Sequence, residues 1–215
     1  MKALRYLAGT AVGGVVIFLL AWSVVGYMSN TGVAEPVYKV EKQASDYEIR
    51  FYAPHLRAEV ALEGGYRETL YGGFRQLADF IFGNNTASQK VDMTAPVISE
   101  SSQKIAMTAP VLSETSETGS RRIISFIMPR EYSLETLPRP NNPEVTIRRI
   151  AEQRVAALRF GGYATEDRAN SKIRKLKAAL ERDGVKMTGE AQVAQYNPPW
   201  TPIWMRRNEI LIPVE

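Results

Sequence analysis

Residues 49–66 read IRFYAPHLRAEVALEGGY, and residues 147–163 read IRRIAEQRVAALRFGGY. Both stretches begin with Ile-Arg and end with Gly-Gly-Tyr, at an offset of 98 residues (147 minus 49) that becomes 97 (161 minus 64) after one deletion. Each predicts two strands, a Gly-Gly-Tyr corner and then an amphipathic helix. The duplication predicts two similar halves packed about a pseudo-twofold axis, with one helix per half on a shared, curved antiparallel sheet.

In the first half, YEIRFY (47–52) and LRAEVAL (56–62) are predicted strands around an Ala53-Pro54 turn, which favours a hairpin. A helix is predicted over 66–82, because apolar residues recur there at helical steps of three and four. Gly72 and Gly73 lie inside this helix, where each costs about 1 kcal/mol relative to alanine. They are either tolerated packing glycines or the point of close approach of a strand or a ligand.

In the second half, a helix is predicted over 166–182, with an apolar face and a basic side. The basic side indicates a solvated surface, with lipid headgroups or ligand carboxylates as the alternative partners. Further strands are predicted at 123–128, 144–150, 154–160, 193–196 and 209–214. A shorter repeat, KVDMTAPVISE (90–100) and KIAMTAPVLSE (104–114), predicts two short strands, each ended by its proline.

The start of the chain predicts a targeting segment over residues 1–34. Residues 6–28 carry no charge and are numerous enough to span the roughly 30 Å hydrocarbon core of a bilayer as a helix. Lys2 and Arg5 precede this run, so the positive-inside rule places the N-terminus in the cytoplasm. We therefore expect a single-pass inner-membrane protein, held by an N-terminal transmembrane helix, with a C-terminal domain (45–215) facing the periplasm or exterior. A cleaved signal peptide ending near Ala34 is the alternative, and residues 31–44 are predicted to be a linker.

Composition excludes several classes of site. The chain contains no cysteine, which rules out disulfides, thiolate nucleophiles and iron–sulfur clusters. Its single histidine, His55, cannot build a multi-histidine metal site. The net charge is +4, and no recognisable nucleic-acid-binding module accompanies it, so we do not expect a nucleic-acid partner. Nothing in the composition indicates whether the chain has protein partners.

The chain resembles the SOUL/heme-binding protein family over nearly all of 45–215. The resemblance rests on ordered, separated segments: YEIRFYAP (47–54), FRQLADFIFGNN (74–85), the two MTAPV copies (93–97 and 107–111), FIMPREYSLETLPRPNNP (126–143), FGGYA (160–164) and YNPPWTPIWMRRNEI (196–210). It implies an α+β fold, a distorted antiparallel β-barrel of eight or nine strands flanked by two helices. It also implies binding of heme or another tetrapyrrole in an apolar groove beside the first of those helices.

The resemblance does not carry over an iron ligand. Some family members have a histidine between the arginine and tyrosine of the YEIRxY motif, and Phe51 occupies that position here. His55, just beyond Pro54, is either a surface histidine or an iron ligand. The sequence therefore favours binding without a strong protein ligand to iron.

A porphyrin is a flat apolar disc with two carboxylates on one edge, so it needs an apolar slot and a cation at the rim. The candidate slot residues lie on the predicted first helix: Tyr71, Phe74, Ala78 and Phe82. Arg75 lies beside them and is the candidate partner for a propionate. Each apolar residue at helical spacing has an alternative role as part of the core.

The leading hypothesis from the sequence is a non-catalytic protein that carries or buffers a tetrapyrrole. Three alternatives stay open: a sensor or scavenger of another hydrophobic small molecule, a tetrapyrrole-modifying enzyme using Glu68 or Asp79, and an interaction module. The proline-stiffened stretch NPPWTPIW (197–204) is predicted to be a lid, a partner or membrane-interface surface, or a plug at one end of the barrel.

Overall fold

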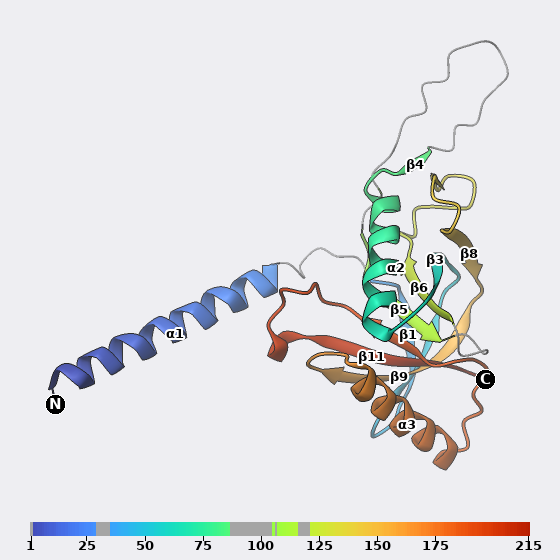
Figure 1. The fold of residues 1–215 in the computed structure, drawn as a ribbon. Coiled ribbons are helices and arrows are strands. Elements are labelled where there is room, and N and C mark those ends of the chain that lie inside the picture. Colours follow the sequence, from blue (N-terminus) through green and yellow to red (C-terminus); the bar gives the residue numbers. More distant parts are fainter. Residues whose placement is uncertain (1, 29–34, 87–104, 106, 116–120) are drawn as a thin grey trace, which may run out of the picture.

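The computed structural model describes residues 2–28, 35–86, 105, 107–115 and 121–215 (Figure 1). The helices are α1 (Lys2–Met28), α2 (Tyr66–Ile81) and α3 (Glu166–Arg182), with a short 3-10 helix, η1 (Ile203–Met205). The strands are β1 (Tyr38–Gln43), β2 (Glu48–Tyr52), β3 (His55–Glu63), β4 (Asn85–Thr86), β5 (Val111–Thr115), β6 (Arg121–Ile127), β7 (Arg139–Pro140), β8 (Thr146–Ile150), β9 (Gln153–Gly161), β10 (Gln192–Gln195) and β11 (Arg207–Val214).

The main sheet has nine strands in the order β1-β2-β9-β11-β10-β5-β6-β3-β8, and every neighbouring pair is antiparallel. The sheet curls around itself (Figure 1), as the predicted barrel does. Within the described residues its edge strands β1 and β8 do not pair with each other, so it is an open half-barrel. The predicted mixed fold with a curled antiparallel sheet is confirmed, and the closed barrel is corrected to an open one.

The sheet has the predicted internal symmetry, with one unexpected feature. The first strand of each half joins the other half: β2 pairs with β9, and β8 pairs with β3. The register is the same in both places, because Arg50 faces Val155 while Arg148 faces Arg57, each shifted by 98 residues. The predicted hairpin of β2 with β3 is therefore wrong. A short connection joins the two strands, but each forms its hydrogen-bonded ladder with a strand of the opposite half.

Both flanking helices pack on the same face of the sheet. Ile210, Val193, Ser113 and Ile124 form one row across β11, β10, β5 and β6, and their side chains point to one side. Ile210 belongs to the core under α3, and Ile124 belongs to the core under α2. The helices therefore cover the convex face of the half-barrel, and the other face, which we call the concave face, carries a third and smaller apolar cluster.

Gly73 allows α2 to lie close to the sheet. A Cβ atom at this position would lie 2.5 Å from Cγ1 of Ile124 on β6, far inside van der Waals contact. At Gly72 a Cβ atom would meet only Cδ1 of Leu62, at 3.3 Å. The approach of a strand is therefore the reason for one glycine of the pair, and Gly72 lies toward the edge of that contact.

The predictions for single elements differ in accuracy. The second predicted helix coincides with α3, and the first ends one residue early, at Ile81. β1 lies within the stretch predicted to be a linker. The second MTAPV copy forms β5 after its proline, Pro110, and not before it, and the first copy (93–97) lies outside the described residues.

The N-terminal segment requires a correction. Residues 2–28 are helical as predicted, and α1 extends away from the sheet (Figure 1). In the described part of the chain, however, no helix is both long enough and apolar enough to cross a membrane. A spanning helix needs roughly 20 consecutive apolar residues. The predicted single-pass inner-membrane location with a periplasmic domain is contradicted by this finding.

The last turns of α1 contact the NPPWTPIW segment. Nε1 of Trp22 donates a hydrogen bond to the carbonyl oxygen of Trp200 at 2.8 Å, and its ring meets that of Trp204 edge-on at 5.7 Å. Trp200 and Trp204 are both more than half exposed, whereas Thr201 and Pro202 of the same segment are buried. The segment forms a docking surface for α1.

Candidate functional site

An open groove runs beside α2 on the convex side of the protein. It has a cavity volume of about 640 Å³ and lies between one side of α2 and the end of β3. Its lining residues are Leu62, Glu63, Glu68, Thr69, Tyr71, Gly72, Phe74, Arg75 and Gln76. Pockets for small molecules typically measure roughly 300–1,000 Å³, so the groove is of the right size for a cofactor-sized ligand.

Three of the six candidate site residues border this groove. Tyr71 is 60% exposed and Phe74 is 36% exposed, so both rings offer apolar surface to a ligand. Phe74 also contacts Phe126 of β6 edge-on, with ring centroids 5.5 Å apart, which fixes its orientation. Arg75 lies beside them and forms no ion pair with any residue that the structure describes.

The other two candidates on α2 lie elsewhere. Ala78 is only 9% exposed and faces the sheet, where it is part of the core. Phe82 follows the last residue of α2 and is exposed. It lies seven residues beyond Arg75, about 10 Å along the helix axis, and does not line the groove. The helical spacing of the sequence placed all these residues in one predicted slot, but the groove ends before it reaches Ala78 and Phe82.

His55 is also separated from the groove. It is the first residue of β3, where His55, Arg57 and Glu59 alternate with residues that face α2, so its side chain lies on the concave face. Its Nδ1 lies 3.0 Å from the carbonyl oxygen of Ala53, and its Nε2 accepts a hydrogen bond from Nε of Arg57 at 3.2 Å. Both ring nitrogens are thus engaged within β3 and its preceding turn. Burial lowers the pKa of His55.

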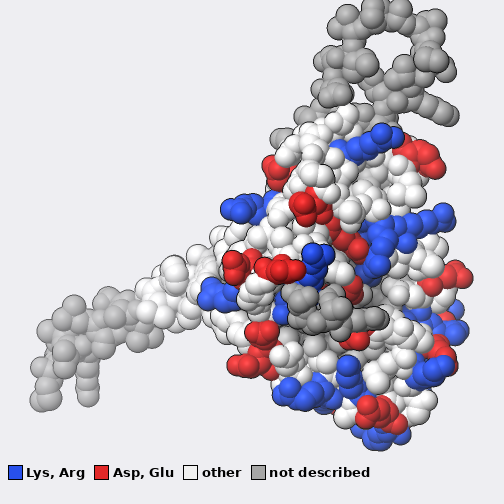
Figure 2. Space-filling view, turned by 45° about the vertical axis from the view of Figure 1, so that its right-hand side comes forward, with Lys and Arg blue, Asp and Glu red and all other residues white. Residues whose placement is uncertain are grey.

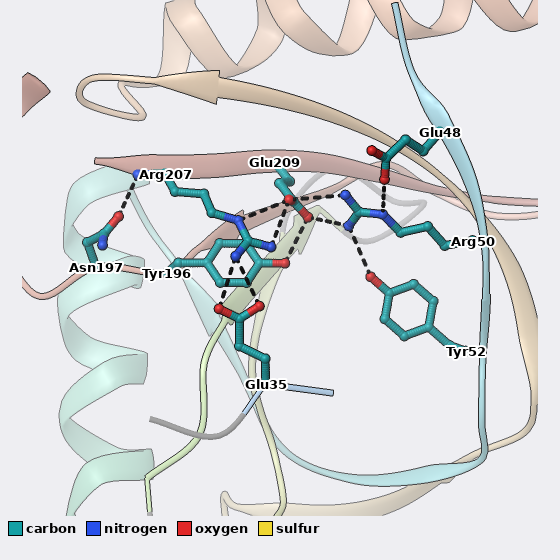
Figure 3. A network of polar contacts seen from close by, with 8 residues as sticks. All are labelled: Glu35, Glu48, Arg50, Tyr52, Tyr196, Asn197, Arg207 and Glu209. Carbon is teal, nitrogen blue, oxygen red and sulfur yellow. Dashed lines mark hydrogen bonds and ion pairs between the residues drawn. The ribbon is translucent and has the colours of Figure 1, made fainter. Parts of the chain in front are cut away.

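The concave face holds a buried polar network that sequence reasoning did not find (Figure 3). Glu209, which is 0% exposed, accepts hydrogen bonds from Arg50 at 2.7 Å, from Tyr196 at 2.8 Å and from Arg207 at 3.0 Å. Burial alone would raise the pKa of Glu209, but the hydrogen bonds and charge of Arg50 and the charge of Arg207 hold it below its usual value. Burial raises the pKa of Tyr52, whose hydroxyl accepts from Arg50, to about 12.

The same network ties the segment before β1 to the sheet. Nη1 of Arg207 donates to both carboxylate oxygens of Glu35 at 3.0 Å, and the backbone N–H of Arg207 donates to the side chain of Asn197. Arg50 also donates to Glu48 on its own strand at 2.8 Å. Two arginines thus meet three carboxylates, so each of the two guanidinium groups is paired with at least one carboxylate inside the network. We interpret it as a structural clasp between β2, β11 and the chain before β1.

Charges elsewhere are mixed. Figure 2 shows acidic and basic side chains interspersed over the face of the molecule that it displays. On α3, Lys175 of the predicted basic side lies 2.7 Å from Asp46. Among the described residues, no group of three or more histidine, aspartate or glutamate side chains is arranged to hold a metal ion.

Sequence reasoning missed the part of the groove that comes from β3. Leu62 and Glu63 border it because the end of β3 runs beside α2, and no periodicity within one element indicates such a neighbour. Gly72 was the one feature of the sequence that could have indicated the groove. A glycine on the exposed side of a helix has no side chain, so it leaves space for a ligand against the helix. The place of Gly72 in the groove lining gives the second glycine of the pair its own explanation.

Taken together, these features define an α+β protein with a duplicated half-barrel and an open groove of ligand size beside α2. The model of the family described as SOUL heme-binding protein matches residues 33–103 and 99–213. The chain therefore belongs to the SOUL heme-binding protein family. It is 29% identical over 170 residues to human (Homo sapiens) Heme-binding protein 2, which covers 78% of each chain. It is 28% identical over 173 residues to the mouse (Mus musculus) Heme-binding protein 2, covering 80% of this chain and 79% of that one.

Solved structures with the same fold are more distant in sequence. The C-terminal domain of EcmrR superposes with a TM-score of 0.54 at 10% identity, over 83% of this chain and 98% of that domain. A hydrolase from Listeria innocua superposes with a TM-score of 0.51 at 13% identity, over 81% of this chain and 94% of that one. At these identities the similarity shows the fold alone.

Proposed function

We propose that this protein binds heme or a related tetrapyrrole in the groove beside α2 and carries or buffers it without catalysing a reaction on it. The observation that carries the proposal is the open cavity of about 640 Å³ bordered by Tyr71, Phe74 and Arg75. Membership of the SOUL heme-binding family and the names of the human and mouse relatives support heme as the ligand.

The groove residues fit the organic part of a porphyrin. The exposed faces of Tyr71 and Phe74 supply aromatic surface for a flat ring. Gly72 has no Cβ atom, so no side chain fills the groove between Tyr71 and Phe74. Arg75 has no ion-pair partner among the described residues, so its guanidinium is available to a propionate carboxylate.

The same residues do not fit ligation of iron by histidine. The groove lining contains no histidine, and His55 lies on the opposite face of the sheet with both ring nitrogens engaged. We therefore propose that the ring and its carboxylates, and not the iron, supply most of the binding energy. Iron-free protoporphyrin should then bind nearly as tightly as hemin.

Titration of the full chain with hemin and with iron-free protoporphyrin tests the proposal. We expect saturable binding of both, seen in the Soret band and in tryptophan fluorescence. Arg75→Gln should weaken binding about three- to tenfold, because it removes a charge-assisted hydrogen bond at a partly exposed site. Arg67→Gln makes the same change at an exposed position of α2 outside the groove and should leave the affinity unchanged.

Two results would contradict the proposal. If neither compound binds at micromolar protein, the groove holds a different apolar ligand or none. If hemin binds equally well to both variants and to Tyr71→Ala, the ligand lies outside this groove.

A further inference from the structure

Arg57 is a buried arginine on the concave face whose charge no carboxylate neutralises at ion-pair distance. It is 5% exposed, and among the described residues no aspartate or glutamate lies within ion-pair reach of its guanidinium. Its hydrogen bonds go to two neutral acceptors, Nε2 of His55 at 3.2 Å and Oε1 of Gln192 at 3.4 Å. A guanidinium carries five N–H groups, and three of those of Arg57 have no hydrogen-bond partner among the described residues, although none of its nitrogens is both fully buried and without a partner.

The two neighbouring carboxylates make no hydrogen bond to Arg57. Glu59 is paired with Arg148 at 3.1 Å, and Glu114 accepts from Gln192 at 2.8 Å. Both carboxylates act on Arg57 only through space, and they offset part of the burial that lowers its pKa. An unpaired charge buried in a protein is strongly unfavourable, so a compensating group is to be expected beside it.

His55 cannot be that group. Its Nδ1–H is directed at the carbonyl oxygen of Ala53, which leaves the Nε2 lone pair to accept from Arg57. This arrangement requires the neutral imidazole, because a protonated ring has no acceptor. His55 therefore orients the guanidinium without neutralising it.

Arg57 lines a small cavity of about 10 Å³. Four other polar residues line it, Tyr52, His55, Gln153 and Gln192, and the remaining seven lining residues are aliphatic or proline. A cavity of this size holds about one water-sized group. The narrow space and its apolar walls favour a small ion that gives up its hydration shell easily over an organic acid, phosphate or sulfate.

We propose that this cavity binds a small, weakly hydrated monovalent anion, of the halide class, against the free N–H groups of Arg57. The site is on the opposite side of the sheet from the groove beside α2 and is independent of the function proposed for that groove. A bound halide would neutralise the guanidinium and connect β3 to β9, β10 and β11 across the concave face. It would stabilise the folded protein, since the anion binds the native state alone.

Thermal unfolding of the full chain at constant ionic strength tests this site, with sodium chloride replacing sodium gluconate, whose anion is too large for the cavity. We expect Tm to rise by roughly 3–5 °C for each tenfold increase in chloride above its dissociation constant. Bromide should act like chloride. Arg57→Gln should abolish the dependence, whereas Arg149→Gln, the same change at an exposed position of the neighbouring strand β8, should keep it.

A second measurement covers the case in which Arg57→Gln does not fold. The ³⁵Cl NMR line of the wild-type protein should be broadened beyond that of buffer, and added bromide should reverse the broadening by competition. Identical Tm values for the wild type in chloride and gluconate, or broadening that bromide leaves unchanged, would overturn the proposal.

Discussion

At the scale of single residues, Arg50 and Arg57 illustrate two treatments of a buried positive charge on one face of one sheet. Arg50 is 4% exposed and lies 2.7 Å from Glu209. Arg57 is equally buried but has only neutral hydrogen-bond partners. The charge of Arg50 is neutralised by a carboxylate of the protein itself. The charge of Arg57 is neutralised only when the proposed anion binds. Removal of a carboxylate should therefore strongly lower the stability of the protein only at the site of Arg50.

Glu209→Gln tests the site of Arg50. The change keeps the shape of the side chain but leaves Arg50 and Arg207 facing a neutral amide in a fully buried position. We expect a loss of about 3 kcal/mol or more in the free energy of unfolding, measured by urea denaturation. Glu63→Gln is the control, because its partner Arg121 and Glu63 itself are both more than 60% exposed, and it should change stability by less than about 1 kcal/mol. Similar small losses in both variants would contradict the structural role of the clasp.

The single histidine gives a direct pH test. Burial lowers the pKa of His55 in the folded protein below its ordinary value of about 6.5, and the neighbouring positive charge of Arg57 acts in the same direction. The unfolded chain then binds more protons than the folded chain as pH falls below about 6.5, so stability decreases on acidification through that range. The ring signals of His55 in an NMR titration should have a midpoint below 6.5.

His55→Gln supplies the matched control for stability. Glutamine keeps an acceptor near Arg57 but does not titrate, so the difference in unfolding free energy between pH 7.5 and pH 5.5 should shrink in the variant. An NMR midpoint at or above 6.5, or the same pH dependence in both proteins, would show that the imidazole is not held neutral.

At the scale of elements, the helices follow from sequence far better than the strand pairing. Helix α3 has the predicted bounds because an apolar face repeating every three to four residues defines a helix by itself. A strand has a period of two whichever strand it pairs with, so β2 and β3 were recognised but wrongly paired with each other. Arg57 was not identified as buried for a separate reason, because a charged residue in a strand ordinarily faces water.

The glycine pair of α2 gives a prediction at this scale. Gly73→Ala would place a methyl group 2.5 Å from Ile124 and push α2 away from β6, at a cost of roughly 1–3 kcal/mol. Gly72→Ala meets only the flexible end of Leu62 and gains about 1 kcal/mol of helix propensity, so it should be neutral or stabilising. Urea denaturation of the two variants distinguishes them. Equal destabilisation would mean that both positions approach the sheet closely.

At the scale of the whole molecule, the exchange of first strands makes the two halves interdependent. The duplication at residues 49–66 and 147–163 allowed the pseudo-twofold to be predicted, but such similar repeats are equally compatible with two self-contained halves. The structure decides between them, because β2 lies beside β9 and β8 lies beside β3. Neither half can complete its own sheet, so the protein should unfold as one cooperative unit.

Leu180→Ala tests this cooperativity across the pseudo-twofold. Leu180 belongs to α3 and is fully buried in the core of the second half, so its truncation should cost about 2–5 kcal/mol. In native-state hydrogen exchange, the backbone amides of Ile210 in the second half and Ile124 in the first should lose the same amount of protection, because both exchange only through global unfolding. If the halves were independent, protection would fall at Ile210 and persist at Ile124. The test is strict because the cores under α2 and α3 share no residue, and the two halves are joined through the pairing of β5 with β10 as well as through the exchanged strands.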